Sequence, residues 1–310
     1  MTAPERMSGV LSPVITPFDG DFNPDAASLI RHCRWLLGQN VGLAVFGTNS
    51  EANSLSVEEK IALLDALVEA GIPAARMMPG TGCCAITDTA RLTAHAVKLG
   101  CSGVLMLPPF YYKGVPDDGL FAAYAQVIER VGDARLRIYL YHIPPVSNVP
   151  LSLPLVERLI KAYPETVVGI KDSSGDWSNT KAMLEAGWTD FRIFAGSENF
   201  LLATMRAGGA GCISATANVN PAAIHALYAN WRAADAEAQQ AALDKIRGLF
   251  QGYVMIPALK AVAAHYSGDA GWRAVRPPLV ALTAAQQSAL IEKLEAAGFA
   301  MRGLTAKAAE

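Results

Sequence analysis

Residues 167–175 read VVGIKDSSG, a run of apolar and β-branched residues that ends at Lys171 and a polar turn. The branched residues before the lysine indicate a short buried strand, and the four residues after it have the composition of a turn. An ammonium group at the end of a buried strand is costly unless it is paired or loses its proton. The neutral amine is the form that condenses with a carbonyl to give a Schiff base. On this segment alone, a lysine that reaches solvent or pairs with Asp172 is the commoner arrangement.

Length and composition place the chain among large globular enzymes. Its 310 residues suit a (β/α)8 barrel with an extension, and 52% of them are hydrophobic against 17% charged. The net charge of −2 provides no basic field for a nucleic-acid backbone. We therefore expect a small-molecule enzyme and no nucleic-acid partner.

Cysteine usage and the chain start predict the cellular compartment. The five cysteines are odd in number and lack the paired spacing of metal sites, which indicates reduced thiols. Residues 1–10 have no apolar signal core, and the apolar runs are too short or interrupted to span a bilayer. The sequence predicts a cytoplasmic protein with no membrane partner.

Short apolar segments alternate with amphipathic segments of helix length along the first two thirds of the chain. The predicted strands are residues 10–17, 42–46, 76–79, 103–107, 137–142, 167–171, 191–195 and 211–215. The predicted helices between them are residues 24–37, 57–70, 86–99, 119–131, 153–162, 179–186 and 198–207. Eight strands, each followed by a segment of helix length, predict an α/β fold of the TIM (β/α)8-barrel type over residues 1–220, with Lys171 on the sixth strand.

Residues 221–310 contain no further strand and consist of alanine-rich amphipathic segments. Their alanines and leucines need another surface to pack on. We therefore predict a C-terminal helical extension that packs on the barrel.

The active site of a TIM barrel lies at the carboxyl ends of the strands, so the polar residues there are the candidates for chemistry. They are residues 47–51, 108–112, Tyr141 and His142, Lys171, residues 196–198, Ser214 and Thr216. Each has a structural alternative: small polar residues cap helices, adjacent tyrosines pack, and a histidine is often only hydrogen-bonded. Residues 80–85 loosely match a dinucleotide motif, but no acidic residue follows at the required spacing, so we expect no such site.

Five motifs in order along the chain carry a family resemblance. They are GTNSE at 47–51, PPFYY at 108–112, YHIPP at 141–145, GIKDSSG at 169–175 and GCISATANVNP at 211–221. Together they resemble the dihydrodipicolinate synthase and N-acetylneuraminate lyase family over nearly the whole chain. The resemblance implies a TIM barrel with C-terminal helices, in which a lysine forms an imine with pyruvate or another 2-oxo acid.

The resemblance also implies roles for individual residues. It makes Lys171 the Schiff-base lysine, with Tyr141 and Thr48 as proton-relay groups. Gly47 and Asn49 lie in the motif that holds the 2-oxo acid carboxylate, and the backbone of Ile213 faces the bound acid. Tyr111 matches a tyrosine inserted across a subunit interface, so we expect a homo-oligomer, either a dimer or a tetramer. Gly196, Ser197 and Glu198 partly match the lyase segment that holds a sugar-acid tail.

Three positions depart from the pattern. Val146 stands where the synthase has an arginine that grips a second carboxylate, which disfavours 4-hydroxy-tetrahydrodipicolinate synthase activity. Asn49 resembles the variant of hydroxy-oxoglutarate aldolases. His142 fits neither subgroup and adds a titratable group that we assign to substrate binding.

The sequence therefore predicts a Schiff-base lyase that cleaves or forms a carbon–carbon bond in a pyruvate-type 2-oxo acid. A dehydratase or deaminase of a small hydroxy acid, such as a hydroxy-pyrroline carboxylate, is the first alternative. The authentic synthase and a non-catalytic 2-oxo-acid-binding regulator are the others. Imine chemistry requires no cofactor, and the five dispersed histidines disfavour a metal site.

Overall fold

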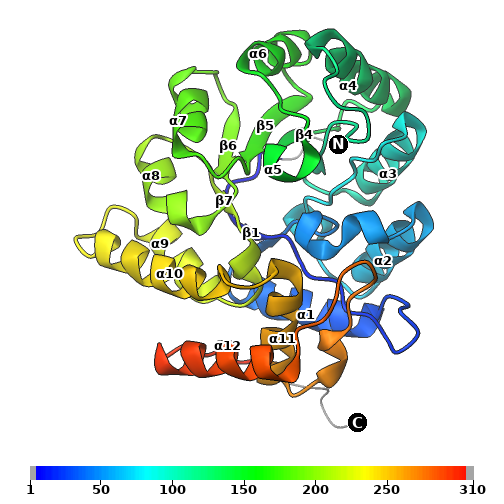
Figure 1. The fold of residues 1–310 in the computed structure, drawn as a ribbon. Helices are drawn as coiled ribbons and strands as arrows, with labels where there is room; N and C mark the ends of the chain where they lie inside the picture. The colour runs from blue at the N-terminus through cyan, green and yellow to red at the C-terminus, as the bar shows by residue number, and fades with distance from the viewer. Residues whose placement is uncertain (1–4, 305–310) are drawn as a thin grey trace. The chain divides into compact units, whose positions relative to one another are not determined.

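The computed structural model describes residues 5–304, and its elements are coloured in chain order in Figure 1. The chain divides into two compact units, the first formed by the residues up to Gly9 with Pro73–Ile213, and the second by Val10–Ile72 with the residues from Ser214 onward. The predicted boundary at residue 220 stays a prediction. The prediction that residues 1–10 lack a leader falls partly on residues 1–4, which lie outside the described residues.

Seven parallel strands form the sheet within residues 5–304, in the order β2-β1-β7-β6-β5-β4-β3. They are β1 (Gly9–Ser12), β2 (Gly42–Leu43), β3 (Val104–Met106), β4 (Ile138–His142), β5 (Val167–Asp172), β6 (Arg192–Ala195) and β7 (Gly211–Ile213). Strand β1 belongs to both units: Gly9 N donates to Ala210 O at 2.8 Å in the first, and Ser214 N donates to Leu11 O at 3.2 Å in the second.

Helices follow the strands much as the periodicity predicts. They are α1 (Ala26–Gly38), α2 (Val57–Glu69), α3 (Ile86–Leu99), α4 (Asp117–Val131), α5 (Pro144–Ser147), α6 (Leu153–Ala162), α7 (Trp177–Glu185), α8 (Leu201–Arg206), α9 (Pro221–Ala229), α10 (Ala236–Phe250), α11 (Met255–Ser267) and α12 (Ala284–Ala296). Local chemistry sets several starts: Asp25, Ser56, Ser152, Asp176 and Thr283 each accept a backbone N–H of the first turn of their helix.

The predicted third strand, residues 76–79, is not a strand in the structure, so the predicted count of eight strands was wrong for residues 5–304. A 3₁₀ turn (Ala74–Arg76) precedes it, and Pro79 has no N–H to donate. The segment still runs parallel to β3: Leu105 N donates to Pro79 O at 2.9 Å, and Thr81 N donates to Leu105 O at 3.1 Å. Only the isolated bridge between Gly80 and Leu105 results.

A buried tyrosine fills the interior of the first unit. Tyr139 on β4 is 0% exposed, and its ring lies edge-on to Phe194 with the centroids 5.9 Å apart. The neighbouring segments make room with glycines, since a Cβ at Gly103 or Gly169 would lie 2.6 or 2.5 Å from the Tyr139 ring. Its hydroxyl accepts a hydrogen bond from Met7 N at 2.6 Å. Burial raises the pKa of Tyr139 to about 12.

The apolar faces of α11 and α12 form the core of the second unit. Val262 and Leu259 of α11 pack in one cluster with Leu290 and Leu294 of α12. Helices α10, α11 and α12 therefore share one apolar core, to which α10 contributes Phe250, and the predicted packing of this region on a barrel stays a prediction. No helix within residues 5–304 has the length and hydropathy needed to cross a membrane.

Candidate active site

A one-residue irregularity in the sheet aligns Lys171 with Tyr141. Strands β4 and β5 pair Ile138 with Val167, and the register then shifts so that Tyr139 pairs with Gly169. Beyond the shift, Tyr141 is opposite Lys171. If the register continued unshifted from the Ile138–Val167 pair, Lys171 would be opposite His142, so the bulge sets the cross-strand neighbour of the lysine.

The two side chains meet in a buried position. Lys171 is 2% exposed and Tyr141 is 3% exposed, and the Lys171 Nζ lies 4.2 Å from the centroid of the Tyr141 ring. An amine over an aromatic face is weakly stabilised as a cation. The structure thus brings together the lysine and the tyrosine that the sequence predicts as catalytic.

His142 and Asp172 follow this pair by one residue on each strand and therefore point to the opposite face of the sheet. The Asp172 carboxylate accepts hydrogen bonds from Asn179 Nδ2 at 3.1 Å and from Thr180 Oγ1 at 2.6 Å, both from α7. It also accepts Ser174 N at 2.9 Å. This carboxylate anchors the turn after Lys171.

His142 is held as a neutral imidazole on that same face. Leu151 N donates to its Nδ1 at 3.0 Å, which leaves the proton on Nε2, 4.0 Å from Asp172 Oδ1. Burial lowers the pKa of His142, and the Asp172 carboxylate opposes that effect. Its predicted role in substrate binding stays a prediction, and its described contacts are with Leu151 and Asp172.

Gly196 lets the end of β6 approach β5 closely. Its N–H donates to Asp172 O at 2.7 Å, and a Cβ on it would lie 2.2 Å from Ser173 Oγ. The following Ser197 accepts Asn199 N at 3.3 Å and starts a 3₁₀ turn (Glu198–Phe200). Glu198 is 1% exposed. All three residues of the predicted tail-binding segment therefore lie in the first unit, beside the strand that carries Lys171.

Ile213 ends β7 and is fully buried. Strand β7 pairs with β6 through Gly211 and Cys212, so Ile213 lies at the carboxyl end of the same sheet segment. Gly211 is required here, because it has a φ of 136° and a Cβ would lie 2.0 Å from Gly9 O.

Tyr111 differs from the other candidates because it is exposed. Tyr111 and Tyr112 are each 73% exposed and form an edge-on pair with centroids 5.3 Å apart. Val146 on α5 is 58% exposed. Lys113 donates to the carbonyls of Phe110 and Ser147, which ties the tyrosine loop to α5 within the first unit.

Gly47, Thr48 and Asn49 belong to the second unit. Gly47 is buried and precedes a 3₁₀ turn (Thr48–Ser50) in which Thr48 and Asn49 are half-buried. Gly47 N donates to Ser50 Oγ at 3.1 Å, and Thr16 Oγ1 donates to Ser50 O at 2.7 Å. The motif is therefore a tightly hydrogen-bonded turn.

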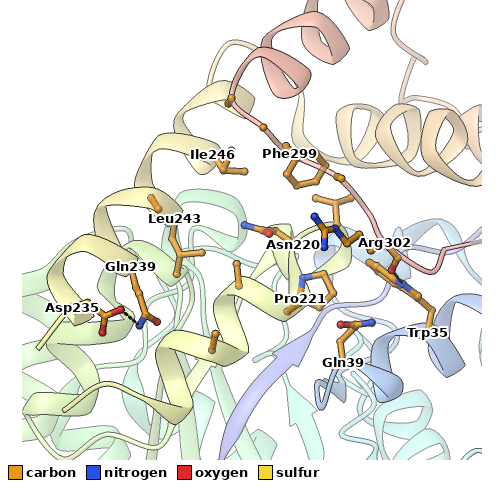
Figure 2. A pocket seen from close by; sticks show the side chains of 18 residues that line it. Trp35, Gln39, Asn220, Pro221, Asp235, Gln239, Leu243, Ile246, Phe299 and Arg302 are labelled. Carbon is orange, nitrogen blue, oxygen red and sulfur yellow. Dashed lines mark hydrogen bonds between the residues drawn. The ribbon is translucent and has the colours of Figure 1, made fainter. Parts of the chain in front are cut away.

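A cavity of about 630 Å³ opens elsewhere in the second unit and contains none of the predicted site residues. Figure 2 shows its lining from α1, α9, α10 and the segment after α12, with Trp35, Leu243 and Phe299 among the larger side chains. The Gln239 amide on its wall donates to Asp235 at 3.1 Å.

Sequence reasoning missed a buried ion pair in the second unit. Lys260 on α11 pairs with Glu51, the residue that ends the GTNSE motif, and both side chains are 0% exposed. A lone lysine within the apolar run from 257 to 264 is the signal that could have found it. Within residues 5–304, no three His, Cys, Asp or Glu side chains are grouped as metal ligands.

The parallel sheet is flanked by helices, and Lys171 is buried near the carboxyl end of one of its strands, an arrangement that a TIM barrel shares. The solved structure of dihydrodipicolinate synthase from Agrobacterium tumefaciens matches with a TM-score of 0.86 and 34% identity, over 93% of this chain and 98% of that chain. The YagE protein of E. coli K12 matches with a TM-score of 0.87 at 24% identity, over 95% and 100% of the two chains, and so supports the fold. These matches confirm the predicted fold class.

The chain belongs to the dihydrodipicolinate synthetase family, whose model matches residues 6–297. A DapA-like lyase of Chloroflexus aurantiacus is 34% identical over 91% of this chain and 94% of its own length. A 4-hydroxy-tetrahydrodipicolinate synthase of Methanococcoides burtonii is 32% identical over 94% and 98%. The predicted family is thereby confirmed, and the chain is a lyase-type enzyme of that family.

Proposed function

We propose that this protein is a lyase that joins Lys171 covalently to a pyruvate-type 2-oxo acid and then breaks or forms the neighbouring carbon–carbon bond. The observation that carries this proposal is the buried Lys171 Nζ, 4.2 Å from the centre of the Tyr141 ring. Membership of a family that includes lyases and synthases supports the same chemistry.

In the proposed reaction, the Lys171 amine attacks the ketone carbon of the 2-oxo acid. The carbinolamine loses water and becomes a protonated imine. A base takes the proton of the hydroxyl on the fourth carbon, and cleavage of the bond between the third and fourth carbons sends its electron pair into the imine, which gives an enamine and releases an aldehyde. A proton added to the enamine carbon restores the imine, and water then releases pyruvate and the free amine. Condensation is the same sequence in reverse.

The proton transfers need acid–base groups beside the imine. We assign them to Tyr141, whose ring adjoins the amine, and to Thr48 and Tyr111 through the family motif. The backbone of Gly47, Asn49 and Ile213 is assigned to the carboxylate of the acid, since backbone N–H groups bind carboxylates well.

The substrate's far end is assigned to residues 196–198 beside β5. A partner that brings a second carboxylate to the site, as the family resemblance implies for the synthase, is best bound by a guanidinium, and Val146 cannot provide one. We therefore propose a hydroxylated 2-oxo acid that carries no second carboxylate at this position.

Reductive trapping tests the proposal. Borohydride added with pyruvate should leave a stable mass adduct on Lys171, because reduction converts the imine to a secondary amine. Lys98→Met, which removes an exposed lysine of α3, should retain the adduct, and Lys171→Met should lose it. A folded wild-type protein that forms no adduct between pH 6 and 9 would contradict the proposal.

Product analysis then separates carbon–carbon cleavage from loss of water or ammonia. Incubation with hydroxylated 2-oxo acids should release pyruvate and an aldehyde. Release of ammonia or water from a hydroxy-pyrroline carboxylate without pyruvate would instead identify the dehydratase or deaminase alternative.

We also propose that Tyr111 completes the site of a second copy of the chain. Two adjacent tyrosines at 73% exposure are unusual on a surface that stays in water. Tyr111→Ala should lower turnover and weaken self-association in sedimentation velocity. A wild-type protein that is monomeric and fully active would contradict this assignment.

A further inference from the structure

The turn that carries Thr48 lies between two residues in left-handed backbone conformation. Phe46 has a φ of 61° and Glu51 a φ of 56°, and neither residue is a glycine. Residues with a Cβ rarely adopt this backbone conformation, because it costs of order 1 kcal/mol or more of free energy. Contacts elsewhere must therefore hold residues 46–51 in place.

The Glu51 carboxylate provides such contacts at one end of the turn. One oxygen pairs with Lys260 Nζ, and the other accepts Arg276 N at 2.9 Å. Glu51 is 3% exposed as a residue, so its charge depends on these partners. The left-handed residue is thus tied both to α11 and to the segment that follows it.

Lys260 has no exposed surface and is held in three directions. Besides Glu51, its Nζ donates to Ala274 O at 2.6 Å and lies 4.3 Å from the centre of the Phe18 ring. Burial lowers the pKa of Lys260 to about 8, with Glu51 acting in the opposite direction, so the ammonium form still prevails at neutral pH.

Residues 274–276, which bond to Lys260 and Glu51, are themselves held in place by further contacts. The Arg276 guanidinium donates to the carbonyls of Phe22 and Ser54 and pairs with Glu59 of α2. A bidentate contact between a guanidinium and a carboxylate fixes the relative orientation of the two groups in addition to balancing their charges. Lys260 therefore joins the turn to a rigid support.

Stability alone does not explain a buried ion pair. Well-packed apolar residues of similar volume often stabilise a protein as much or more, whereas a charged pair fixes one geometry. Here the fixed geometry is that of the turn with Thr48, to which Thr16 adds a second tie through Ser50 O.

We infer that Lys260 is a positioning residue for the proton relay, acting through Glu51 to hold the Thr48 hydroxyl in its working position. The inference rests on the proposed function, in which Thr48 moves protons at the imine. Lys260 lies in the C-terminal helical region, outside the five family motifs, so the inference gives that region a part in the chemistry.

The test separates imine formation from proton transfer. In D₂O, an enzyme that forms the enamine of pyruvate exchanges the methyl protons for deuterium, which NMR follows directly. The double variant Glu51→Gln with Lys260→Met removes both charges and keeps an acceptor for Arg276 N. It should trap pyruvate on Lys171 like the wild type but exchange the methyl protons about 100-fold more slowly, since displacement of a relay group by about 1 Å has that effect.

Val262→Ala is the matched control, because it lies on α11 in the apolar cluster and leaves Glu51 and Lys260 paired. It should lower the melting temperature and leave the methyl exchange rate within about twofold of wild type. Wild-type methyl exchange in a double variant that folds and traps pyruvate would overturn the inference.

Amide hydrogen exchange gives a readout that needs no catalysis. Residues 46–51 should exchange at least 10-fold faster in Lys260→Met, and in the double variant, than in Val262→Ala. Unchanged protection of these residues would overturn the positioning role. If wild-type protein traps no pyruvate, the proposed function fails, and this measurement alone decides whether Lys260 holds the turn.

Discussion

Lys171 in the first unit and Lys260 in the second are both buried, and the two differ in what surrounds Nζ. Lys260 in the second unit has a carboxylate, a carbonyl and an aromatic ring around its Nζ. Lys171 in the first unit lies over the Tyr141 ring, and within residues 5–304 it forms no ion pair. A lysine with a carboxylate partner is kept as a cation and serves the architecture. A buried lysine without one is the arrangement on which the proposed covalent chemistry depends.

Exchange of Lys171 for methionine should give the largest effect. Turnover should fall by about 10⁴-fold or more, because loss of a nucleophile removes the whole covalent route. The free energy of unfolding should change by no more than about 1 kcal/mol, since within residues 5–304 no carboxylate loses an ion-pair partner and methionine still packs on the Tyr141 ring. Activity assays and urea unfolding of the same preparation measure both. A loss of stability above about 3 kcal/mol would show that this lysine is structural after all.

The same exchange at Lys260 should have the opposite profile. Lys260→Met leaves the Glu51 carboxylate buried without its cation, which should cost about 3–5 kcal/mol of unfolding free energy. Adding Glu51→Gln should recover most of that loss, and the four proteins form a double-mutant cycle. Purely additive losses would mean that the ion pair contributes nothing as a pair.

His32 adds a second kind of buried base to the comparison, since within residues 5–304 it has an amide partner and no carboxylate partner. Its Nε2 lies 3.4 Å from Asn218 Oδ1, and burial lowers the pKa of His32 to about 4. The unfolded chain binds this proton near pH 6.5 and the folded protein only near pH 4. Stability is therefore lost as the pH falls through that window.

Between pH 7 and pH 4, the free energy of unfolding of the wild type should fall by about 3 kcal/mol more than that of His32→Gln. Taking the difference removes the contribution of the carboxylates, which both proteins share. Parallel stability curves for the two proteins would contradict the neutral, buried state of this imidazole.

A smaller effect should come from the close approach of β6 to β5. Gly196→Ala places a methyl group against Ser173 Oγ and Asp172 O and should cost about 1–3 kcal/mol. Gly119→Ala in α4 is the control: the nearest atom to an added Cβ is Pro116 Cδ at 4.0 Å, and the change should raise the free energy of unfolding by about 0.5–1 kcal/mol. Equal melting temperatures for the two variants would show that the packing around the turn after Lys171 does not require a glycine at position 196.

Periodicity predicts most of the fold, because each strand is a short apolar run and most helices are amphipathic segments, several of which begin at a capping side chain. It fails at residues 76–79, where a proline within the apolar run prevents a regular ladder. It is also silent on the bulge between β4 and β5, since an extra residue in a buried strand leaves an apolar run unchanged.

Motifs located the lysine and tyrosine of the candidate site because both end buried strands. They could not reveal Lys260, which is more than 200 positions from Glu51 and occurs in a helix that otherwise predicts packing. Nor could they show that His142 and Asp172 face away from Lys171, because that depends on the alternation of side chains along a paired strand.

The bulge at the start of β5 has an evolutionary consequence. Loss of the codon for the extra residue would turn the bulge into a regular ladder, in which Tyr141 still pairs with Lys171. A descendant gene could thus lose the bulge through one small deletion and still keep the lysine beside the tyrosine.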